Sequence, residues 1–249
     1  MFRTNGSGGV NAENSLGFNL RRSLLSATSL ATTLLFLVPG IADAQSTTRD
    51  WSGPFVGATV GGTFGGGSID LSYSDSSNSP PTIGVPMLGP SGSIVGGYNF
   101  QRGNFVYGLA ADGSVLVATG QASGSNYSAN ERLYGLLSLR GRLGLATGPL
   151  LLYATGGIAG GYARFDTTIS DGATHNSTLA AAMGAGFVFG PTVGAGGEYA
   201  INDHVSLTAE GTVTQLGPLT ASGDNGKGSY TASSRTTTVG VRGGVNFHF

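Results

Sequence analysis

The sequence predicts an all-β fold: an eight-stranded antiparallel up-and-down transmembrane β-barrel with short periplasmic turns and long external loops. Eight segments of the 249-residue chain carry large apolar residues at every second position, the pattern of strands with two different faces. Short and long connections alternate between these segments. The charged residues well inside them lie opposite the large apolar residues. These observations together favour a barrel that is apolar outside and polar inside.

The composition limits the classes of protein to which the chain can belong. Only 10% of its residues are charged, the formal net charge is −1, and 45 residues are glycine. Soluble domains average roughly 25% charged residues, so this chain is poor in charge. No block of lysine and arginine provides a footprint for nucleic acid, and no such partner is expected. The chain has no cysteine, which excludes a disulfide scaffold, a thiolate metal site and a lipidated cysteine anchor.

The N-terminus has the three parts of a secretory signal peptide. Arg21 and Arg22 precede the apolar run 24–38, and an Ala-Asp-Ala cleavage site ends at Ala44. The apolar run is shorter than the roughly 20 residues that a transmembrane helix needs. We therefore expect export and cleavage between Ala44 and Gln45, which divides the chain into a signal peptide (1–44), a short lead-in (45–53) and a β-barrel (54–249).

The predicted strands follow one another along the mature chain. In the first four, the large apolar residues that share a face are Val56, Ala58, Val60 and Phe64 (54–64); Ile94, Tyr98 and Phe100 (93–100); Phe105, Tyr107, Leu109, Val115 and Val117 (104–117); and Leu133, Leu137, Leu139, Leu143 and Leu145 (132–145). In the last four they are Leu150, Leu152, Ile158 and Tyr162 (150–162); Val193, Tyr199 and Ile201 (192–201); Val205, Leu207 and Val213 (205–213); and Val239, Val241, Val245, Phe247 and Phe249 (236–249). Turn-forming residues bound these runs, as they bound strands.

The connections between the predicted strands alternate in length. Short turns are expected at 101–104, 146–149 and 202–204. Long connections rich in Ser, Asn, Asp and Gly are expected at about 65–91, 119–130, 166–180 and 217–234. Outer-membrane barrels have this arrangement, with short turns on the periplasmic side and longer loops outside.

One apolar segment, 179–191, lies where a long loop is expected. Its large residues have the same parity as Val193, so we interpret it as an outward extension of the sixth strand. A bend is expected at Gly190-Pro191, because this pair weakens a strand ladder. A ninth strand is the alternative, and it would leave an odd number of strands.

The placement of charges favours a membrane barrel over a soluble β-sandwich, which remains the alternative fold. A lysine or arginine on the lipid-facing side costs about 2–4 kcal/mol near the bilayer midplane, so a barrel excludes it there. An unpaired charge in a low-dielectric interior is also costly. We therefore expect the six charged residues well inside the strands to form a paired network in the lumen: Asp112, Arg140, Arg142, Glu198, Glu210 and Arg242.

Several stretches carry a family resemblance: "WSGPFVGATVGGTFGG", "GGYNFQRGNFVYGLAADGSV", "LSLRGRLGLATGPLLLYATGGIA", "TVGAGGEYAINDHVSLTAEGTVTQLG" and the closing "VGVRGGVNFHF". In this order they resemble the small outer-membrane β-barrel surface proteins of alphaproteobacteria, of the porin-like or opacity type and related to OmpA-like transmembrane barrels. The resemblance extends from Trp51 to Phe249. The chain departs from it at Pro54 and Pro191, where aromatic residues are usual, and at Gly62, where tyrosine is usual.

The resemblance implies a location in the outer membrane of a Gram-negative bacterium after export by the signal peptide. Outer-membrane lipids and lipopolysaccharide would then surround the barrel. It also implies that the barrel-assembly machinery recognises the C-terminal aromatic residues Phe247 and Phe249. The resemblance names no ligand for the loops.

No residue pattern indicates catalysis, a cofactor or a metal site. His175 alone combines the external side with hydroxyl neighbours, as a lipid-A-modifying barrel enzyme would require. The leading hypothesis is a non-enzymatic outer-membrane protein that contributes to envelope structure and surface display, with a lumen largely plugged by charged residues. A small-solute, porin-like channel on the same fold is the alternative, and the lipid-modifying enzyme ranks third.

Overall fold

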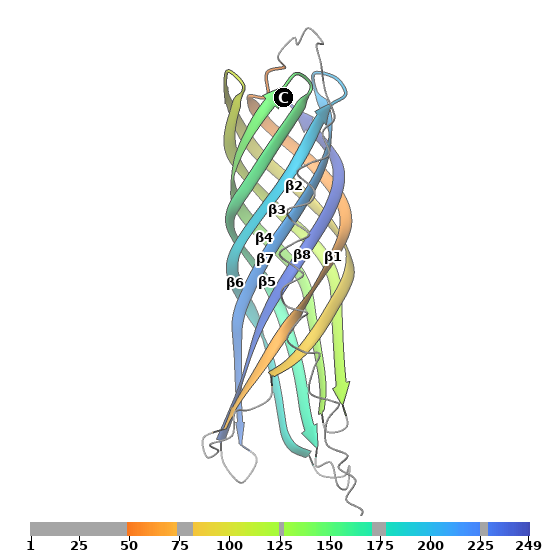
Figure 1. Cartoon of the computed structure of the whole chain (residues 1–249), viewed down its shortest axis with the longest axis vertical. Coiled ribbons are helices and arrows are strands. Elements are labelled where there is room, and N and C mark those ends of the chain that lie inside the picture. The colour runs from red at the N-terminus through yellow and green to blue at the C-terminus, as the bar shows by residue number, and fades with distance from the viewer. Residues whose placement is uncertain (1–48, 74–81, 125–126, 171–177, 225–228) are drawn as a thin grey trace, which may run out of the picture. The chain divides into compact units, whose positions relative to one another are not determined.

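The computed structural model describes residues 49–73, 82–124, 127–170, 178–224 and 229–249. Eight strands form one closed antiparallel barrel, in which each strand pairs with its neighbours in the chain and the first pairs with the last (Figure 1). The strands are β1 (Gly53–Tyr73), β2 (Thr82–Arg102), β3 (Phe105–Gly124), β4 (Tyr127–Thr147), β5 (Leu150–Ser170), β6 (Thr178–Ala200), β7 (Val205–Asp224) and β8 (Ser229–His248). In the described ranges no helix is long and apolar enough to cross a membrane. The predicted eight-stranded antiparallel barrel is confirmed.

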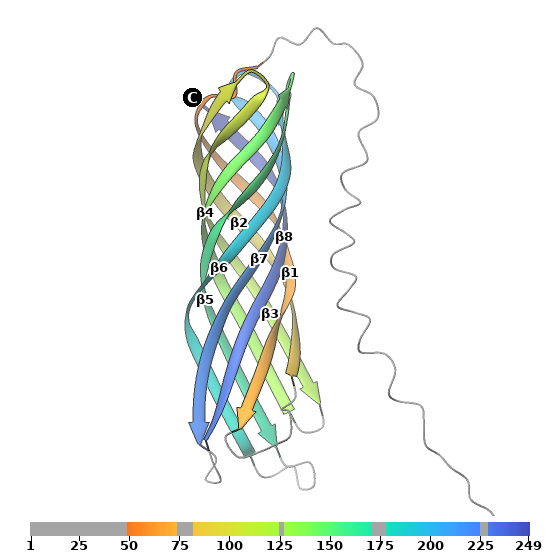
Figure 2. The ribbon, with the colours of Figure 1, turned by 60° about the vertical axis from the view of Figure 1, so that its left-hand side comes forward.

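The connections at one end of the barrel are tight, and the C-terminus lies at this end (Figures 1 and 2). Arg102 pairs with Phe105 and Thr147 with Leu150, so two-residue turns join β2 to β3 and β4 to β5. Each turn begins with a glycine of positive φ, Gly103 at 60° and Gly148 at 56°, a conformation that other residues adopt at a cost. The strands cross the barrel at a marked tilt, as closure of a sheet requires (Figure 2).

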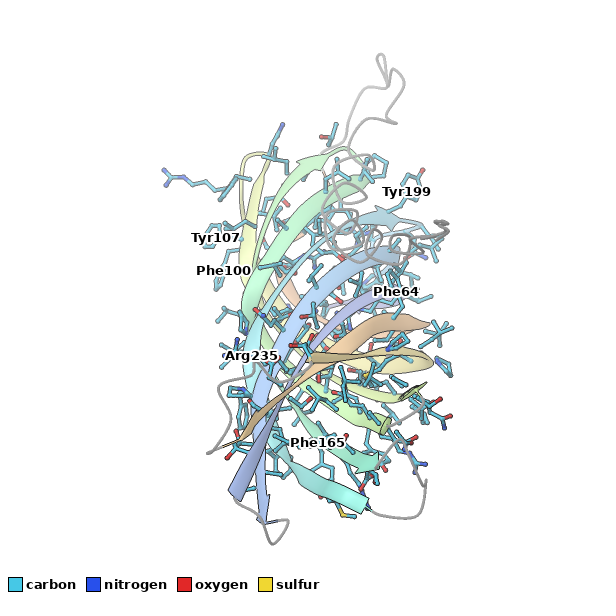
Figure 3. The ribbon with its side chains drawn as sticks, turned by 60° about the horizontal axis from the view of Figure 1, so that its bottom comes forward. Phe64, Phe100, Tyr107, Phe165, Tyr199 and Arg235 are labelled. Carbon is cyan, nitrogen blue, oxygen red and sulfur yellow. The ribbon has the colours of Figure 1, made fainter. Side chains whose placement is uncertain are left out.

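The outward-facing side chains in the half of the barrel near the short turns and in its middle are apolar. Exposed residues on this surface include Val60, Ile94, Leu109, Leu139, Ile158, Val213 and Val241. Aromatic side chains gather at its two borders, as in membrane barrels. Phe100, Tyr107 and Tyr199 mark the border near the short turns, and Figure 3 shows them at the end opposite Phe165. Phe64, Tyr134, Tyr162 and Phe187 mark the other border, with Tyr162 lying 6.3 Å from Tyr134 and 5.4 Å from Phe187 between ring centroids.

The structure corrects the prediction of long loops at about 65–91, 119–130, 166–180 and 217–234. Most of these residues belong to strands of 20–23 residues, which leave only 74–81, 125–126, 171–177 and 225–228 between them. The strand ends were missed because their Ser, Thr, Asn and Gly content resembles that of loops. Their alternation is nevertheless regular, and it has the opposite sense to that of the lipid-facing half.

In these extensions most large apolar side chains point inward and most outward side chains are polar, with Leu88 an outward exception. Two buried clusters fill the interior, one formed by Ile69, Ile83, Val85, Ala129, Phe165 and Ala232, the other by Met87, Leu116, Ala118, Leu133, Ala163, Val188 and Leu216. Outward neighbours such as Ser68, Asp70, Thr82 and Thr237 are exposed. This is the arrangement of a barrel in water, so the long-connection end has the chemistry of a barrel outside the bilayer.

A β-bulge in β4 corrects the placement of Leu133. The β4–β5 register shifts between Leu133 and Leu136, where β4 has one extra residue. The β3–β4 register shifts at the same level, between Val115 and Ala118, where the extra residue is on β3. An extra residue in a strand reverses the inward and outward parity beyond it. Leu133, predicted to share the outward face of Leu137, is therefore 1% exposed inside the barrel, whereas Leu137 is 70% exposed.

The predicted outward extension of the sixth strand is confirmed. β6 is one continuous strand that begins at Thr178. Its residues Met183, Phe187 and Phe189 point outward with 64%, 72% and 68% of their surface exposed. Within the described residues the β6–β7 ladder covers only Thr192–Ala200 on β6, although β6 stays paired with β5 and β7 with β8 beyond that point. The ladder ends beside Pro191, which has no N–H to donate.

Candidate functional site

Four of the six charged residues predicted to face the lumen meet in the middle of the barrel. The guanidinium of Arg140 on β4 donates to Asp112 Oδ1 on β3 at 2.7 Å and also to Glu210 on β7. Arg242 on β8 donates from Nη2 to Glu210 Oε2 at 3.0 Å and to Asp112 Oδ1 at 3.3 Å. Two arginines and two acids thus form a closed, charge-balanced cluster. Its side chains are between 2% and 13% exposed, so the pairing largely takes place out of bulk water.

Hydroxyl groups extend this central cluster. Ser138 Oγ donates to Asp112 Oδ1 at 2.7 Å, and Thr155 Oγ1 accepts from Arg140 Nη1 at 3.0 Å. A cavity lies against Asp112, Arg140 and the hydroxyls around them. The space that the centre of a water molecule can occupy in it is about 50 Å³. One water needs roughly 10–15 Å³ on this measure, so the cavity has room for a few waters.

The other two predicted charges meet nearer the short turns. Arg142 Nη2 on β4 lies 2.5 Å from Glu198 Oε2 on β6. The second oxygen, Glu198 Oε1, accepts from Ser206 Oγ at 2.5 Å and lies 2.7 Å from His248 Nε2. Glu198 is completely buried, and the Arg142 guanidinium lies 3.7 Å from the centroid of the Tyr153 ring. Cation–π contact and hydrogen bonding together stabilise a charge that has left water, although Arg142 Nε has no hydrogen-bond partner among the described residues.

Residues 49–52 of the lead-in fold into the mouth of the barrel at the short-turn end. Trp51 is fully buried among Val106, Ala146, Leu151 and Tyr153. Its backbone N–H donates to Gln101 Oε1 at 2.7 Å, and the Arg49 guanidinium lies 4.5 Å above its ring. Arg49 also donates to the carbonyl of Asn202. Beside them, hydrogen bonds from the hydroxyl and the backbone N–H of Ser52 lower the pKa of the Asp50 carboxyl.

Glu131 is a buried acid that the sequence did not single out. It lies on the inward face of β4 in the external half of the barrel, whose interior is apolar. Its side chain is 2% exposed and accepts a hydrogen bond from Thr236 on β8. Its Oε2 has no hydrogen-bond partner in the described part of the chain. A Cβ at Gly67 on β1 would lie 1.6 Å from that oxygen, so the carboxylate reaches across to a position that only glycine leaves open. The sequence did carry a signal for this position. Glu131 alternates with the charged residue Arg132 and shares its parity with Ala129 and Leu133, which would have placed it on the inward face.

The remaining predicted residues lie apart from these clusters. Phe247 and Phe249 point outward at the short-turn end, with their ring centroids 5.0 Å apart. Ala44, Gln45 and His175 lie outside the described residues. His204 is exposed at a short turn. Throughout the described ranges no group of three or more His, Cys, Asp and Glu side chains could hold a metal ion.

Comparisons with known proteins agree with this architecture. Residues 28–247 match the family described as outer membrane protein beta-barrel domain. The chain is 32% identical over 181 residues to the 31 kDa outer-membrane immunogenic protein of Brucella melitensis, covering 68% of this chain and 73% of that protein. It is also 32% identical over 162 residues to the 22 kDa outer membrane protein of Rhizobium leguminosarum, covering 64% and 67%.

Solved structures of similar chains include Neisserial surface protein A, with a TM-score of 0.38 and 15% identity over 80% of this chain and 98% of that one. Another is OprG from Pseudomonas aeruginosa, with a TM-score of 0.46 and 13% identity over 80% and 97%. The family match spans most of the chain, and both curated relatives are named as outer-membrane proteins. This chain therefore belongs to the outer membrane protein beta-barrel domain family and is an outer-membrane protein.

Proposed function

We propose that this protein is a non-enzymatic barrel that contributes to envelope structure and displays its external loops, with a lumen too well filled to conduct. The observation that carries the proposal is the filling of the interior at successive levels. Trp51 occupies the mouth near the short turns, two ion-paired clusters follow, and apolar side chains pack at the external end. An eight-stranded barrel is just wide enough for side chains to fill.

The electrostatics support a structural role for the paired charges. Each acid in the two clusters has at least one arginine partner, and the clusters are buried. Removing one member of a buried pair typically costs about 3–5 kcal/mol, because the other charge is left without compensation. Such groups tie β3, β4, β6, β7 and β8 together across the lumen. They are poorly suited to serve as mobile binding groups for a permeating ion.

The external end supports the display role. The strands continue past the outer aromatic border with a largely polar outer surface, so their ends lie beyond the bilayer. The relative in Brucella melitensis is named an immunogenic outer-membrane protein, and that name fits a chain presented at the cell surface.

The channel alternative rests on the central cavity, which is lined by small hydroxyl residues such as Thr63, Ser91 and Ser93 besides the charges. A channel would require this cavity to connect with both ends. The apolar clusters and Trp51 stand on either side of it along the strands.

The test is ionic current through the mature chain, residues 45–249, refolded into planar lipid bilayers. We expect the native protein to be silent. We expect Arg142→Ala to be silent as well, because Trp51 and the external apolar clusters still fill the path. A channel would conduct in its native form, and Arg142→Ala would change its ion selectivity while Arg235→Ala, on the outer face of β8, would not. Steady, salt-dependent native conductance would replace the proposal with the channel alternative.

A further inference from the structure

Two arginines face each other on the outer surface of the barrel. Arg132 on β4 and Arg164 on β5 are direct partners in the antiparallel register, and both side chains point outward and are exposed. Directly opposed residues have their Cβ atoms roughly 4.5–5.5 Å apart, and like charges at such positions destabilise the pair of strands. The β-bulge in β4 creates this arrangement, because it turns Arg132 outward and Leu133 inward.

The arginine pair lies at the border between the lipid-facing surface and the external half. The next outward positions toward the membrane are Tyr134 and Tyr162, and the Tyr162 ring also packs edge-on against Phe187. Beyond the arginines the paired outward residues are Asn130 and Asp166. Aromatic girdles in barrels mark the membrane interface. The two guanidinium groups therefore lie at the level of the lipid headgroups of the outer leaflet.

The local charge is not balanced by the protein. Arg164 has one acidic partner, Asp166, with Nε 3.3 Å from Oδ2, and both side chains are about 40% exposed (44% and 39%). Exposed pairs of this kind contribute little to stability. In the described part of the chain no carboxylate lies within ion-pair distance of Arg132. Two positive charges and one negative charge leave a net positive site.

We propose that Arg132 and Arg164 bind the phosphate group of an outer-leaflet glycolipid, that is, the phosphorylated sugar of lipopolysaccharide. A guanidinium presents two parallel N–H donors that match the oxygens of a phosphate, and two opposed guanidiniums can converge on one such group. The acyl chains of the same lipid lie against Tyr134, Tyr162 and Phe187. A bound anion removes the repulsion between the arginines, which explains why two like charges occupy directly opposed positions.

The outer face of β8 provides a matched control. Arg235 is also outward and exposed in the external half, but its register partner on β1 is Ser68, so it has no basic neighbour across the strand pair. A site made only by general positive charge would use Arg235 as well. A site made by two converging guanidiniums would not. This inference depends on the outer-membrane location and is independent of whether the lumen conducts.

The experiment is native mass spectrometry of the refolded mature chain in detergent micelles, titrated with lipid A that carries both phosphates. We expect the combined variant Arg132→Ala/Arg164→Ala to bind at least tenfold more weakly, and Arg235→Ala to bind like the native chain. Lipid A without phosphate is expected to bind the native chain at least tenfold more weakly. All substitutions are at exposed positions, and unchanged emission from the single tryptophan, Trp51, verifies the fold of each variant.

Two further arms separate a lipid site from a phosphate site. Millimolar inorganic phosphate is expected to leave lipid A bound, and Tyr162→Ala is expected to weaken binding severalfold, because the acyl chains contribute. Equal retention of lipid A by the combined arginine variant would overturn the proposal, as would equal binding of lipid A without phosphate. Complete displacement by inorganic phosphate would overturn the assignment to a glycolipid.

Discussion

Replacing Phe165 by alanine tests whether the external end of the barrel has a hydrophobic core of its own. The Phe165 side chain is 1% exposed and packs inside the barrel with Ile69, Ile83 and Val85. A Cβ at Gly184 on β6 would lie 2.4 Å from the Phe165 ring, so the ring fills the space up to the next strand. Core Phe→Ala substitutions cost about 3–5 kcal/mol, through lost burial and the cavity left behind.

The assay is urea unfolding of the mature chain refolded in lipid vesicles, followed by Trp51 fluorescence and far-ultraviolet circular dichroism. We expect Phe165→Ala to lower the free energy of unfolding by about 3–5 kcal/mol. The control Ser68→Ala, beside Ile69 but on the polar outer face, is expected to stay within about 0.5 kcal/mol of the native value, as surface substitutions do. If Phe165→Ala also stayed within that margin, the segment would behave as a loop and the described core would be refuted.

Four other substitutions test the interior by the same unfolding assay. Arg140→Ala is expected to cost about 3–5 kcal/mol, because Asp112 and Glu210 lose a buried partner; an effect no larger than that of Arg235→Ala would contradict the central ion-paired cluster. Gly67→Ala is expected to destabilise the barrel, because the new Cβ would clash with the Glu131 carboxylate. In the double variant, Glu131→Ala should relieve much of that loss. Strictly additive effects of the two substitutions would argue against the contact. Trp51→Ala, read by circular dichroism, is expected to cost about 3–5 kcal/mol, and a neutral result would show that Trp51 does not fill the mouth.

The lipid-facing half of the barrel was predictable because its two faces differ so strongly. Within one strand exposed Leu139 is followed by buried Arg140, and within another buried Glu198 is followed by exposed Tyr199, which leaves a single consistent assignment of outside and inside. The extension of β6 past Phe189 followed from the same rule. The pairing of particular charges could not be predicted, because it depends on strand register and closure around the whole barrel.

The external half was missed for a physical reason. Beyond the membrane the rule inverts, so that Ile69 points inward while Ser68 faces water, and a pattern of small polar residues then resembles a loop. The bulge near Leu133 could not be predicted either. One extra residue leaves no trace in the composition, but it exchanges the inward and outward faces for all residues of the strand beyond it. Glu131 and the outward arginine pair were lost with it. Sequence patterns locate faces, whereas register and bulges decide which residues meet.

The most direct test of the filled interior is the water accessibility of single cysteines, since the chain has none of its own. Cysteine is introduced separately at Ser68, Ile69 and Thr63, and each refolded variant in vesicles is treated with a membrane-impermeant maleimide. The account predicts rapid labelling of Ser68→Cys and protection of both inward positions. Ile69 is packed in the external apolar cluster, and Thr63 is buried beside the central cavity, which filled levels close off on either side. Labelling of both inward positions as fast as Ser68→Cys would contradict it and would show an open, water-filled lumen.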